Sequence, residues 1–377
     1  MSNTLVKALK TKEFRKKLLF TIFAVVVVRL GCQLPIPCID SAQVSAYLQS
    51  TLGDSFSLMN SFTGGSFLSM SIFALNVTPY ITASIIMQLL TIAIPALEEM
   101  HRDGEDGRKK MSKITRYLTV VLGIIESGSM AVAFAKQGTL GADYNALSII
   151  TMIVALTSGA VLVMWLGERI TENGIGNGIS IILLVNIVSR MPNDFYVLYE
   201  QFMKGKQIGP ALIAGAVIAG VVIFTIVFVI ILSDGERHIP IQYSKKIQGR
   251  KMVGGQSTHI PLKVNTAGVI PIIFASSILQ VPLIIQNLLN YQNNGVLGKI
   301  LVSLSSASWF DMDHPARSLG LLVYIVLVII FAYFYTSITF NPIEVSNNMK
   351  KQGGFIPGIR PGKPTQEYLN RLLSYII

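Results

Sequence analysis

Long apolar runs recur along the whole chain, and they restrict its fold more than any other feature. A run of about 20 mostly apolar residues is long enough to cross a bilayer as an α-helix. Eight such runs lie near residues 18–35, 72–96, 117–135, 148–166, 176–191, 210–232, 268–289 and 318–340, although the fifth is short and the second is interrupted. The chain is therefore expected to be an all-α polytopic membrane protein with eight complete spans.

The composition supports lipid as the main solvent of this chain. Of the 377 residues, 51% are hydrophobic and only 14% are charged, and the mean hydropathy is +0.56. An average soluble domain has roughly 25% charged residues. No part of the chain is left over for a separate soluble domain. A last apolar run begins at Leu372, six residues from the end at Ile377, and we interpret it as the start of a ninth span in a truncated chain.

Basic residues predict the orientation in the membrane, because cytoplasmic segments retain Lys and Arg. On alternate sides of the spans, 24 of the 31 basic residues fall on one side. They lie in residues 1–17, 102–116, 169, 237–263 and 350–371. The N-terminus is thus expected to be cytoplasmic. The first apolar run is expected to be retained, since residues 31–35 lack the small-x-small pattern of a signal-peptide cleavage site.

Two loops on the basic side, residues 233–267 and 341–366, are polar, rich in glycine and longer than a helix connection requires. Long cytoplasmic loops suggest a docking surface for a partner. Their positive charge could also attract anionic lipid, at about 1 kcal/mol per residue, or bind RNA or acidic proteins. For each basic residue, the ordinary inside-positive bias of a membrane protein is an equally good explanation.

Ionisable residues are almost absent from the spans, which argues against transporters and intramembrane enzymes. Arg29 lies near the outer end of the first run, and Glu126 lies inside the third, with either a functional or a hydrogen-bonded structural role. None of the nine Asp residues lies in an apolar run, and the four His residues show no HExxH spacing. No catalytic residue, metal site or cofactor is expected. Cys32 and Cys38 are interpreted as small apolar side chains.

Glycine and serine precede the second run at residues 63–66, and Pro79 follows them. This pattern is compatible with a short helix that dips into the protein and returns, a structure tolerated at membrane depth only inside protein or a cavity. An ordinary surface loop that leads to a helix explains the pattern equally well.

Four segments carry a family resemblance, in order and at suitable spacing. They are SIFALNVTPYITASIIMQLL (Ser71–Leu90), RITENGIGNGISIILL (Arg169–Leu184), GQSTHIPLKVNTAGVIPIIFASSIL (Gly255–Leu279) and NPIEVSNNMKKQGGFIPGIRPGKPT (Asn341–Thr365). In these segments the chain resembles the bacterial SecY family, and the resemblance covers essentially the whole sequence. It implies a protein-conducting channel made of two inverted, pseudo-symmetric halves, residues 18–191 and 210–377, joined by an external linker at 192–209.

The resemblance also implies a plug helix at about residues 62–74 and a ring of apolar side chains at the waist of the channel. Apolar side chains can form only a dewetted constriction, which holds back ions but adapts to a polypeptide. Leu183 replaces an expected isoleucine with little change of volume. The implied plug residues are Phe67, Leu68, Ser69, Ile72 and Phe73, and the implied ring residues are Ile81, Ile85, Leu183, Ile187 and Ile273.

A lateral gate and a set of partners follow from the same resemblance. The implied gate residues are Thr82, Gln88, Asn265 and Thr266, and the implied partner-binding residues are Lys246, Arg250, Lys251 and Arg360. The expected partners are the subunits SecE and SecG, the motor ATPase SecA, the ribosome with its RNA, signal sequences, preproteins and membrane lipid. The expected location is the bacterial inner membrane, where the channel would pass unfolded preproteins and release membrane segments sideways into lipid.

Two other classes of protein compete with this interpretation. A secondary transporter also has inverted repeats and broken helices, but the carboxylates that couple ions are missing here. A purely structural membrane scaffold leaves the long basic loops unexplained.

Overall fold

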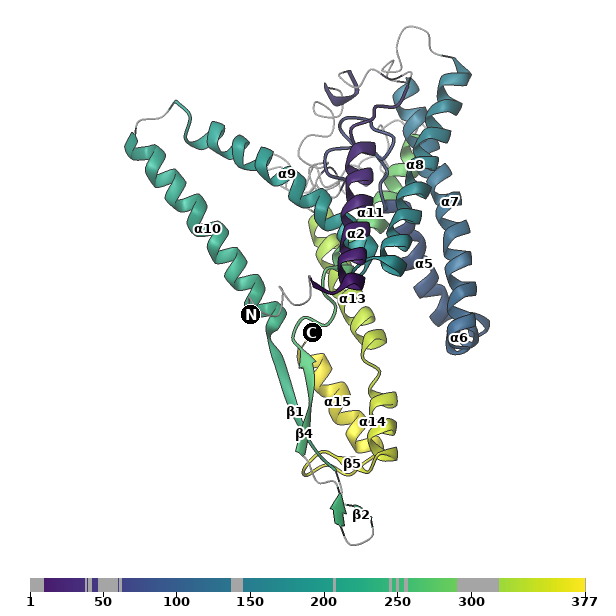
Figure 1. Ribbon diagram of the computed structural model, residues 1–377, viewed down its shortest axis with the longest axis vertical. Coiled ribbons are helices and arrows are strands. Elements are labelled where there is room, and N and C mark those ends of the chain that lie inside the picture. The colour runs from purple at the N-terminus through teal and green to yellow at the C-terminus, as the bar shows by residue number, and fades with distance from the viewer. Residues whose placement is uncertain are drawn as a thin grey trace. The chain divides into compact units, whose positions relative to one another are not determined.

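Each of the eight apolar runs contains a helix in the computed structural model of the protein (Figure 1). The structure describes residues 10–37, 39, 43–46, 60, 63–136, 145–205, 208–243, 246–248, 251–253, 257–289 and 319–376. The described residues form two compact units. The first lies within Met1–Val197 and Ser277–Leu321, and the second lies within Leu198–Ser276 and Leu322–Ile377.

The first unit is a bundle of helices with α8 at its centre. Its helices are α2 (Lys12–Gly31), α5 (Thr78–Ala93), α6 (Pro95–Arg102), α7 (Glu105–Lys136), α8 (Ala146–Asn173) and most of α9 (Gly178–Phe202). Helix α8 contacts α2, α5 and α7, and α7 also contacts α5 and α6. Side chains of α8 enter both buried clusters of this unit, Leu156 in one and Ile170 in the other.

Five helices of the described chain are long and apolar enough to cross a membrane, namely α7, α8, α9, α10 (Ile208–Asp234) and α13 (Leu319–Thr339). The apolar part of α5, Thr78–Ala93, and that of α11 (Ile270–Leu289) are shorter. Multiple spans are thus confirmed, and the count of eight stays a prediction. The last apolar run, from Leu372, lies in α15 (Lys363–Ile376), where Leu372 and Leu373 are buried.

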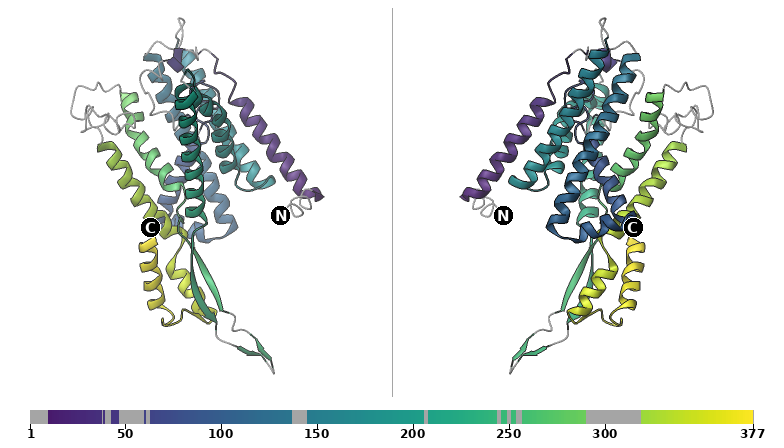
Figure 2. Two further views of the ribbon diagram at one scale, coloured as in Figure 1. Left: turned by 90° about the vertical axis from the view of Figure 1, so that its left-hand side faces the viewer. Right: turned by 90° about the vertical axis from the view of Figure 1, so that its right-hand side faces the viewer.

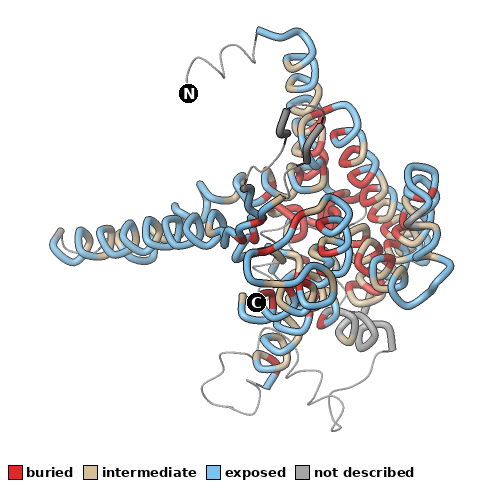
Figure 3. The backbone as a smooth tube through the Cα atoms, turned by 90° about the horizontal axis from the view of Figure 1, so that it is seen from below, coloured by how far each residue is buried: buried red, intermediate tan, exposed pale blue. Residues whose placement is uncertain are grey.

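Helix α10 shows most directly why this protein needs lipid. Large apolar side chains such as Leu212, Ile223 and Phe224 are exposed along its length. No residue of α10 whose burial is described is buried, and its tube on the left of Figure 3 is pale blue and tan throughout. A helix that is apolar on all sides is stable only where lipid or another protein covers it.

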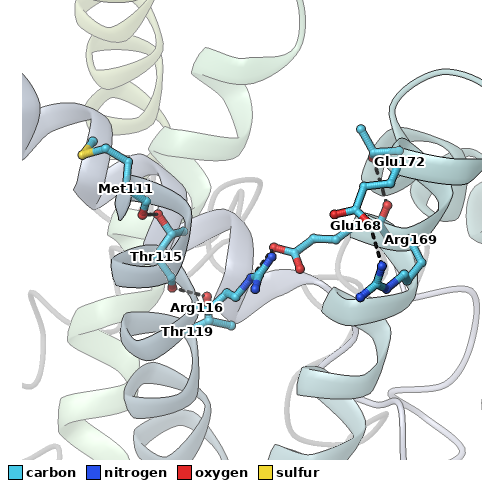
Figure 4. Close-up of polar contacts among 9 residues, drawn as sticks. Met111, Thr115, Arg116, Thr119, Glu168, Arg169 and Glu172 are labelled. Carbon is cyan, nitrogen blue, oxygen red and sulfur yellow. Dashed lines mark hydrogen bonds and ion pairs between the residues drawn. The ribbon is translucent and has the colours of Figure 1, made fainter. Parts of the chain in front are cut away.

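A single ion pair joins the charged ends of α7 and α8 in Figure 4. The Nε atom of Arg116 on α7 donates to Oε1 of Glu168 on α8 at 2.9 Å. On α8 itself, Arg169 pairs with Glu172 at 2.7 Å and lies over the ring of Trp165. Of these two ion pairs, Arg116–Glu168 links two helices, so it contributes to the alignment of α7 with α8.

We expect the Arg116–Glu168 pair to contribute little to stability, because the Arg116 side chain is 44% exposed and that of Glu168 is 16% exposed. Exposed pairs typically contribute about 0.2–1 kcal/mol. A double-mutant cycle with Arg116→Met and Glu168→Gln, measured as the free energy of unfolding in detergent, should give a coupling in that range that weakens with salt. A coupling above about 2 kcal/mol would show that the pair is shielded from solvent.

The second unit contains α10, the first part of α11 (as far as Ser276), most of α13, and a small module outside the apolar helices. This module, the docking module, comprises strands β1 (Glu236–Tyr243), β4 (Ser257–Lys263) and β5 (Gly354–Phe355) with helices α14 (Pro342–Lys351) and α15. The strand order is β4-β1-β5, and β1 is antiparallel to both neighbours. Figure 2 shows the green β1–β4 hairpin beside the yellow helices α14 and α15. A separate pair, β2 (Lys246–Gln248) and β3 (Lys251–Val253), lies between β1 and β4 in the sequence.

The strands within residues 233–267 and 341–366 add a small sheet to a fold that was expected to be all-α. Ile239 and Ile241 on β1 are buried, while His238, Pro240 and Gln242 between and beside them are exposed. This alternation has the period of two that is typical of a half-buried strand. With Leu262, Met349 and Leu369 the two isoleucines form the core of the docking module. The protein is therefore mainly helical with a small sheet.

Local sequence explains why α14 begins and ends where it does. The side chain of Asn341 accepts hydrogen bonds from the amides of Ile343 (3.1 Å) and Glu344 (3.4 Å). Pro342 occupies the first helical position, where a missing N–H removes no helical bond. Lys350 and Lys351 lie in the last turn, where positive charge is favourable.

Candidate functional site

The predicted plug residues lie in a segment of consecutive turns, residues 63–77, which we name the turn segment. The resemblance implied a plug helix, and the structure corrects this for the described residues. Residues 63–70 and 72–77 are turns, separated by an isolated bridge at Ser71. The backbone is left-handed at Gly64 (φ 66°) and Gly65 (φ 89°), and also at Met70 (φ 45°) and Asn76 (φ 49°), which no α-helix permits. Phe62 is outside the described residues.

Most of the turn segment is buried in the first unit. Of the predicted plug residues, Phe67 and Phe73 are buried, Leu68 and Ile72 are half-buried, and Ser69 is exposed. A buried segment that forms no regular helix must satisfy its backbone polar groups through turns and side chains. The hydroxyl of Ser66 does so in part, since it lies 2.7 Å from the carbonyl oxygen of Thr63 and 3.1 Å from that of Phe73.

Backbone hydrogen bonds attach the turn segment to the chain that follows α2. The amide of Ile36 donates to the carbonyl of Met70, and the amide of Ile72 donates to the carbonyl of Leu34, both at 3.0 Å. These two bonds flank the antiparallel bridge between Pro35 and Ser71. The segment is thus held at one edge by its neighbour in the sequence.

Glycines let two helices approach the turn segment closely. A Cβ atom on Gly31 of α2 would lie 2.0 Å from the ring of Phe73. A Cβ atom on Gly159 of α8 would lie 2.0 Å from the carbonyl oxygen of Ile72. Only hydrogen fits at either position without a shift of the neighbouring atoms.

Arg29 of α2 makes a polar contact with both the turn segment and α9. Its Nη1 atom lies 3.4 Å from the carbonyl oxygen of Gly64 and 3.4 Å from Oδ1 of Asn186. An open pocket of about 520 Å³ lies beside this contact. It is lined by Arg29, Gln33, Ser45, Gly64, Gly65, Leu68, Ser69, Ser189, Arg190 and Asn193.

The predicted ring residues are divided between the two units. In the first unit, Ile81 on α5 and Leu183 on α9 pack against the same buried cluster, which includes Val28, Phe73 and Ile182. Ile85 is buried one turn further along α5, and Ile187 is 39% exposed one turn further along α9. Ile273, in the first turn of α11, is half-buried in the second unit. The structure thus brings Ile81 and Leu183 to one cluster, and convergence of all five stays a prediction.

The predicted gate residues use much of their polar capacity locally. The hydroxyl of Thr82 donates to the carbonyl of Thr78 in its own helix, and Gln88 is exposed on α5. Asn265 and Thr266 lie in the turn between β4 and α11. There the Asn265 side chain accepts from the amide of Gly268 at 2.9 Å, and the Thr266 hydroxyl donates to the carbonyl of Lys263 at 2.8 Å. Thr82 and Gln88 lie in the first unit and the other two in the second.

The docking module presents Arg360 on a well-anchored loop between β5 and α15. Arg360 is exposed, while its carbonyl oxygen accepts a hydrogen bond from the hydroxyl of Thr365 at 2.9 Å. On the same loop Ile356 is buried in the module core. The hydroxyl of Ser346 on α14 donates to the carbonyl of Gly362 at 2.9 Å. An ordered loop with an exposed arginine is suited to bind an acidic partner surface.

The other three predicted partner contacts are only partly described. Lys246 lies on β2 and Lys251 on β3, and their side chains are not described. Arg250 lies outside the described residues, between these two short strands.

The structure also describes Cys32 and Glu126, which the sequence analysis noted apart from the predicted site. Cys32 is buried and unpaired after α2, in agreement with its interpretation as a small apolar side chain, and Cys38 lies outside the described residues. Glu126 is half-buried on α7. Its neighbour Ser127 forms a hydroxyl hydrogen bond with Thr157 of α8 at 3.0 Å.

Sequence reasoning did not select Gly31, Gly159 or Asn186 as site residues, yet each contacts the turn segment or its polar partner. Two of them carried a signal. Gly159 lies in the small-residue triplet Ser158–Ala160 of an apolar run, a pattern typical of close helix contacts in membranes. Asn186 is a polar residue inside the fifth apolar run.

Comparison with known proteins agrees with these features. A family model described as SecY matches residues 71–377. The protein translocase subunit SecY of Corynebacterium glutamicum is 41% identical over 391 residues, which cover 100% of this chain and 85% of that protein. The corresponding subunit of Streptomyces scabiei is 42% identical over 393 residues, with 100% and 86% covered.

Solved structures show the same fold. One, described as a protein conducting channel, has a TM-score of 0.65 at 20% identity and covers 97% of this chain and 83% of its own. Sec61 in the canine ribosome-channel complex has a TM-score of 0.59 at 18% identity, with 97% and 82% covered. The predicted family and the helical, multi-pass membrane fold are thereby confirmed. The chain therefore belongs to the SecY family, the central pore-forming subunits of protein translocases.

Proposed function

We propose that this chain conducts unfolded preproteins across the membrane and that its turn segment is the plug of the resting channel. The observation that carries this proposal is the burial of a non-helical segment among helices that span a membrane. Such backbone is tolerated at membrane depth only where protein or a cavity encloses it. A related structure supports the assignment, because the plug domain of that SecY protein is described as stabilising the closed state and maintaining a membrane seal.

In this mechanism an apolar constriction seals the path around the moving chain. Ile81, Ile85, Leu183, Ile187 and Ile273 form the ring, and their side chains offer an ion no replacement for its hydration shell. A signal sequence binds at the gate formed by Thr82, Gln88, Asn265 and Thr266. The plug then leaves its place, and hydrophobic segments pass sideways into lipid. Residues 18–191 and 210–377 act as the two inverted halves.

The docking module receives the partner that drives transport. With the N-terminus cytoplasmic, the β1–β4 hairpin and Arg360 face the cytoplasm of a bacterial cell. SecA or the ribosome binds there, through Arg360 together with Lys246, Arg250 and Lys251, while SecE and SecG complete the complex in the inner membrane. Ribosome contacts are described for two structural relatives, canine Sec61 and the yeast Ssh1 complex.

Reconstitution tests the proposed function. Vesicles that contain this protein with SecE, SecG and SecA should import a preprotein when ATP is present, and vesicles without this protein should not. Uptake of a small solute without a motor, and no import of a preprotein, would favour the secondary transporter instead.

Arg360→Glu should reduce SecA-driven import at least about tenfold, because charge reversal at a docking contact opposes an acidic partner by about 1.4 kcal/mol or more. The resting ion conductance should not change, since Arg360 lies on an exposed loop of the docking module. Arg371→Glu, which reverses an exposed charge on α15, is the matched control. Equal import by the Arg360 variant and the wild type would remove Arg360 from the docking contact.

A further inference from the structure

The guanidinium group of Arg29 joins three separate elements of the first unit. It projects from α2, and its Nη1 atom lies 3.4 Å from the carbonyl oxygen of Gly64 in the turn segment. The same atom lies 3.4 Å from Oδ1 of Asn186 on α9. A charged donor makes stronger hydrogen bonds than a neutral one, above all where little water competes.

The Oδ1 atom of Asn186 lies where few other hydrogen-bond donors can reach it. The Asn186 side chain is fully buried, and it lies between the ring candidates Leu183 and Ile187 in the sequence of α9. Within the described residues its Nδ2 atom has no hydrogen-bond partner. Among the described residues, the bond from Arg29 is thus the hydrogen bond of the Asn186 side chain. Its loss would leave both polar atoms of that side chain unpaired.

The turn segment is shaped to let this contact form. Gly64 has a left-handed φ of 66°, and a Cβ atom there would lie 2.5 Å from Nη1 of Arg29 and 3.1 Å from Cα of Asn186. The glycine therefore allows the carbonyl group to approach the guanidinium and the α9 backbone together.

We propose that Arg29 is the latch of the plug: its bonds to Gly64 and Asn186 hold the turn segment against α2 and α9 in the resting channel. This inference rests on the proposed function of the turn segment as a plug. Displacement of the segment breaks the bond to Gly64, so the latch adds to the free energy of opening. Arg29 is a positioning residue that acts through the plug and need not touch the translocated chain.

If Arg29 acts as a latch, its hydrogen bonds to Gly64 and Asn186 are required. If Arg29 acts only through its positive charge near the channel mouth, the charge is required but the hydrogen bonds are not. Three variants separate these explanations. Arg29→Gln removes the charge and shortens the reach, and Asn186→Ala removes the acceptor but keeps the charge. Arg190→Gln is the control, because Arg190 lines the same pocket but, among the described residues, pairs with Asp194 at 3.9 Å and not with the turn segment.

Hydrogen exchange of the whole protein in lipid nanodiscs provides the first measurement. The amides of Ile36 and Ile72 report on the turn segment, since both bond across the bridge that holds it. We expect Arg29→Gln and Asn186→Ala to raise their exchange rates at least about tenfold. The double variant should show no further increase over Arg29→Gln alone, because Arg29→Gln already removes the contact with Asn186. Arg190→Gln should exchange at the wild-type rate.

Ion conductance of the reconstituted channel without a preprotein provides the second measurement, and it should rise in parallel with exchange. Wild-type exchange in both Arg29→Gln and Asn186→Ala would overturn the latch. So would an equal increase in Arg190→Gln, which would point to charge alone. Faster exchange with unchanged conductance would overturn the gating role, since the turn segment would then move without opening the channel. If the wild type fails to import preproteins, the proposed function fails, whatever the exchange rates show.

Discussion

Replacement of Gly159 by alanine is expected to raise the ion conductance of the resting channel at least about tenfold. The new Cβ atom would lie 2.0 Å from the carbonyl oxygen of Ile72 and 2.9 Å from its carbonyl carbon. Backbone atoms cannot rotate away as a side chain can, so either α8 or the turn segment must shift. Overpacking of this kind typically costs about 1–3 kcal/mol. If that cost falls on the closed state, about 1.4 kcal/mol gives a tenfold change in the open population.

The measurement is single-channel or bulk conductance in planar bilayers without a preprotein. Gly128→Ala on α7 is the matched control, because a Cβ atom there would meet nothing within 4 Å. Alanine also has the better helix propensity, so this control should leave stability unchanged or slightly raised. Wild-type conductance in a folded Gly159→Ala protein would mean that the turn segment does not seal the channel.

Leu369→Ala is expected to unfold the docking module while the first unit stays intact. The Leu369 side chain is fully buried in the cluster that joins α15 to Ile239 and Ile241 of β1. Truncation of such a leucine typically costs about 2–5 kcal/mol, from lost burial and from the cavity that it leaves. A small module has little stability in reserve, so the β1 and β4 amides should exchange much faster and SecA-driven import should fall.

The resting conductance of Leu369→Ala should match the wild type, because the turn segment and its partners lie in the other unit. Tyr375→Ala on the same helix is the control, since the Tyr375 side chain is 79% exposed. Hydrogen exchange of β1 and β4 at the wild-type rate in Leu369→Ala would show that α15 does not support the hairpin.

Part of the docking module could have been predicted from local patterns. The residues His238–Gln242 alternate between exposed and buried positions. In β4 the exposed Pro261 lies between the half-buried Ile260 and the buried Leu262. The high polarity of residues 233–267 led to a prediction of loops, because half of each strand faces water. The contact of β5 with β1 joins residues more than 100 positions apart, and no local pattern indicates it.

The functional residues, too, could be predicted only in part from the sequence. Motif resemblance selected Phe67, Phe73 and Ile81, and the structure places Phe67 and Phe73 in buried clusters of the first unit and packs the half-buried Ile81 against one of them. It implied a helix for the plug, whereas the turns depend on contacts with residues 34–36 and with α8. Arg29 was visible as a charge inside an apolar run, but its partners Gly64 and Asn186 lie 35 and 157 positions away.

The sequence by itself determined that this chain crosses a membrane repeatedly and which family it belongs to. The physical reason is that the thickness of a bilayer and the cost of charge within it act on each run of about 20 residues separately. Only the tertiary structure decided that residues 63–77 are turns, that Gly159 must stay small and that Arg29 bonds to Gly64 and Asn186. These features come from packing between distant segments, where the position of one backbone depends on the side chains of another.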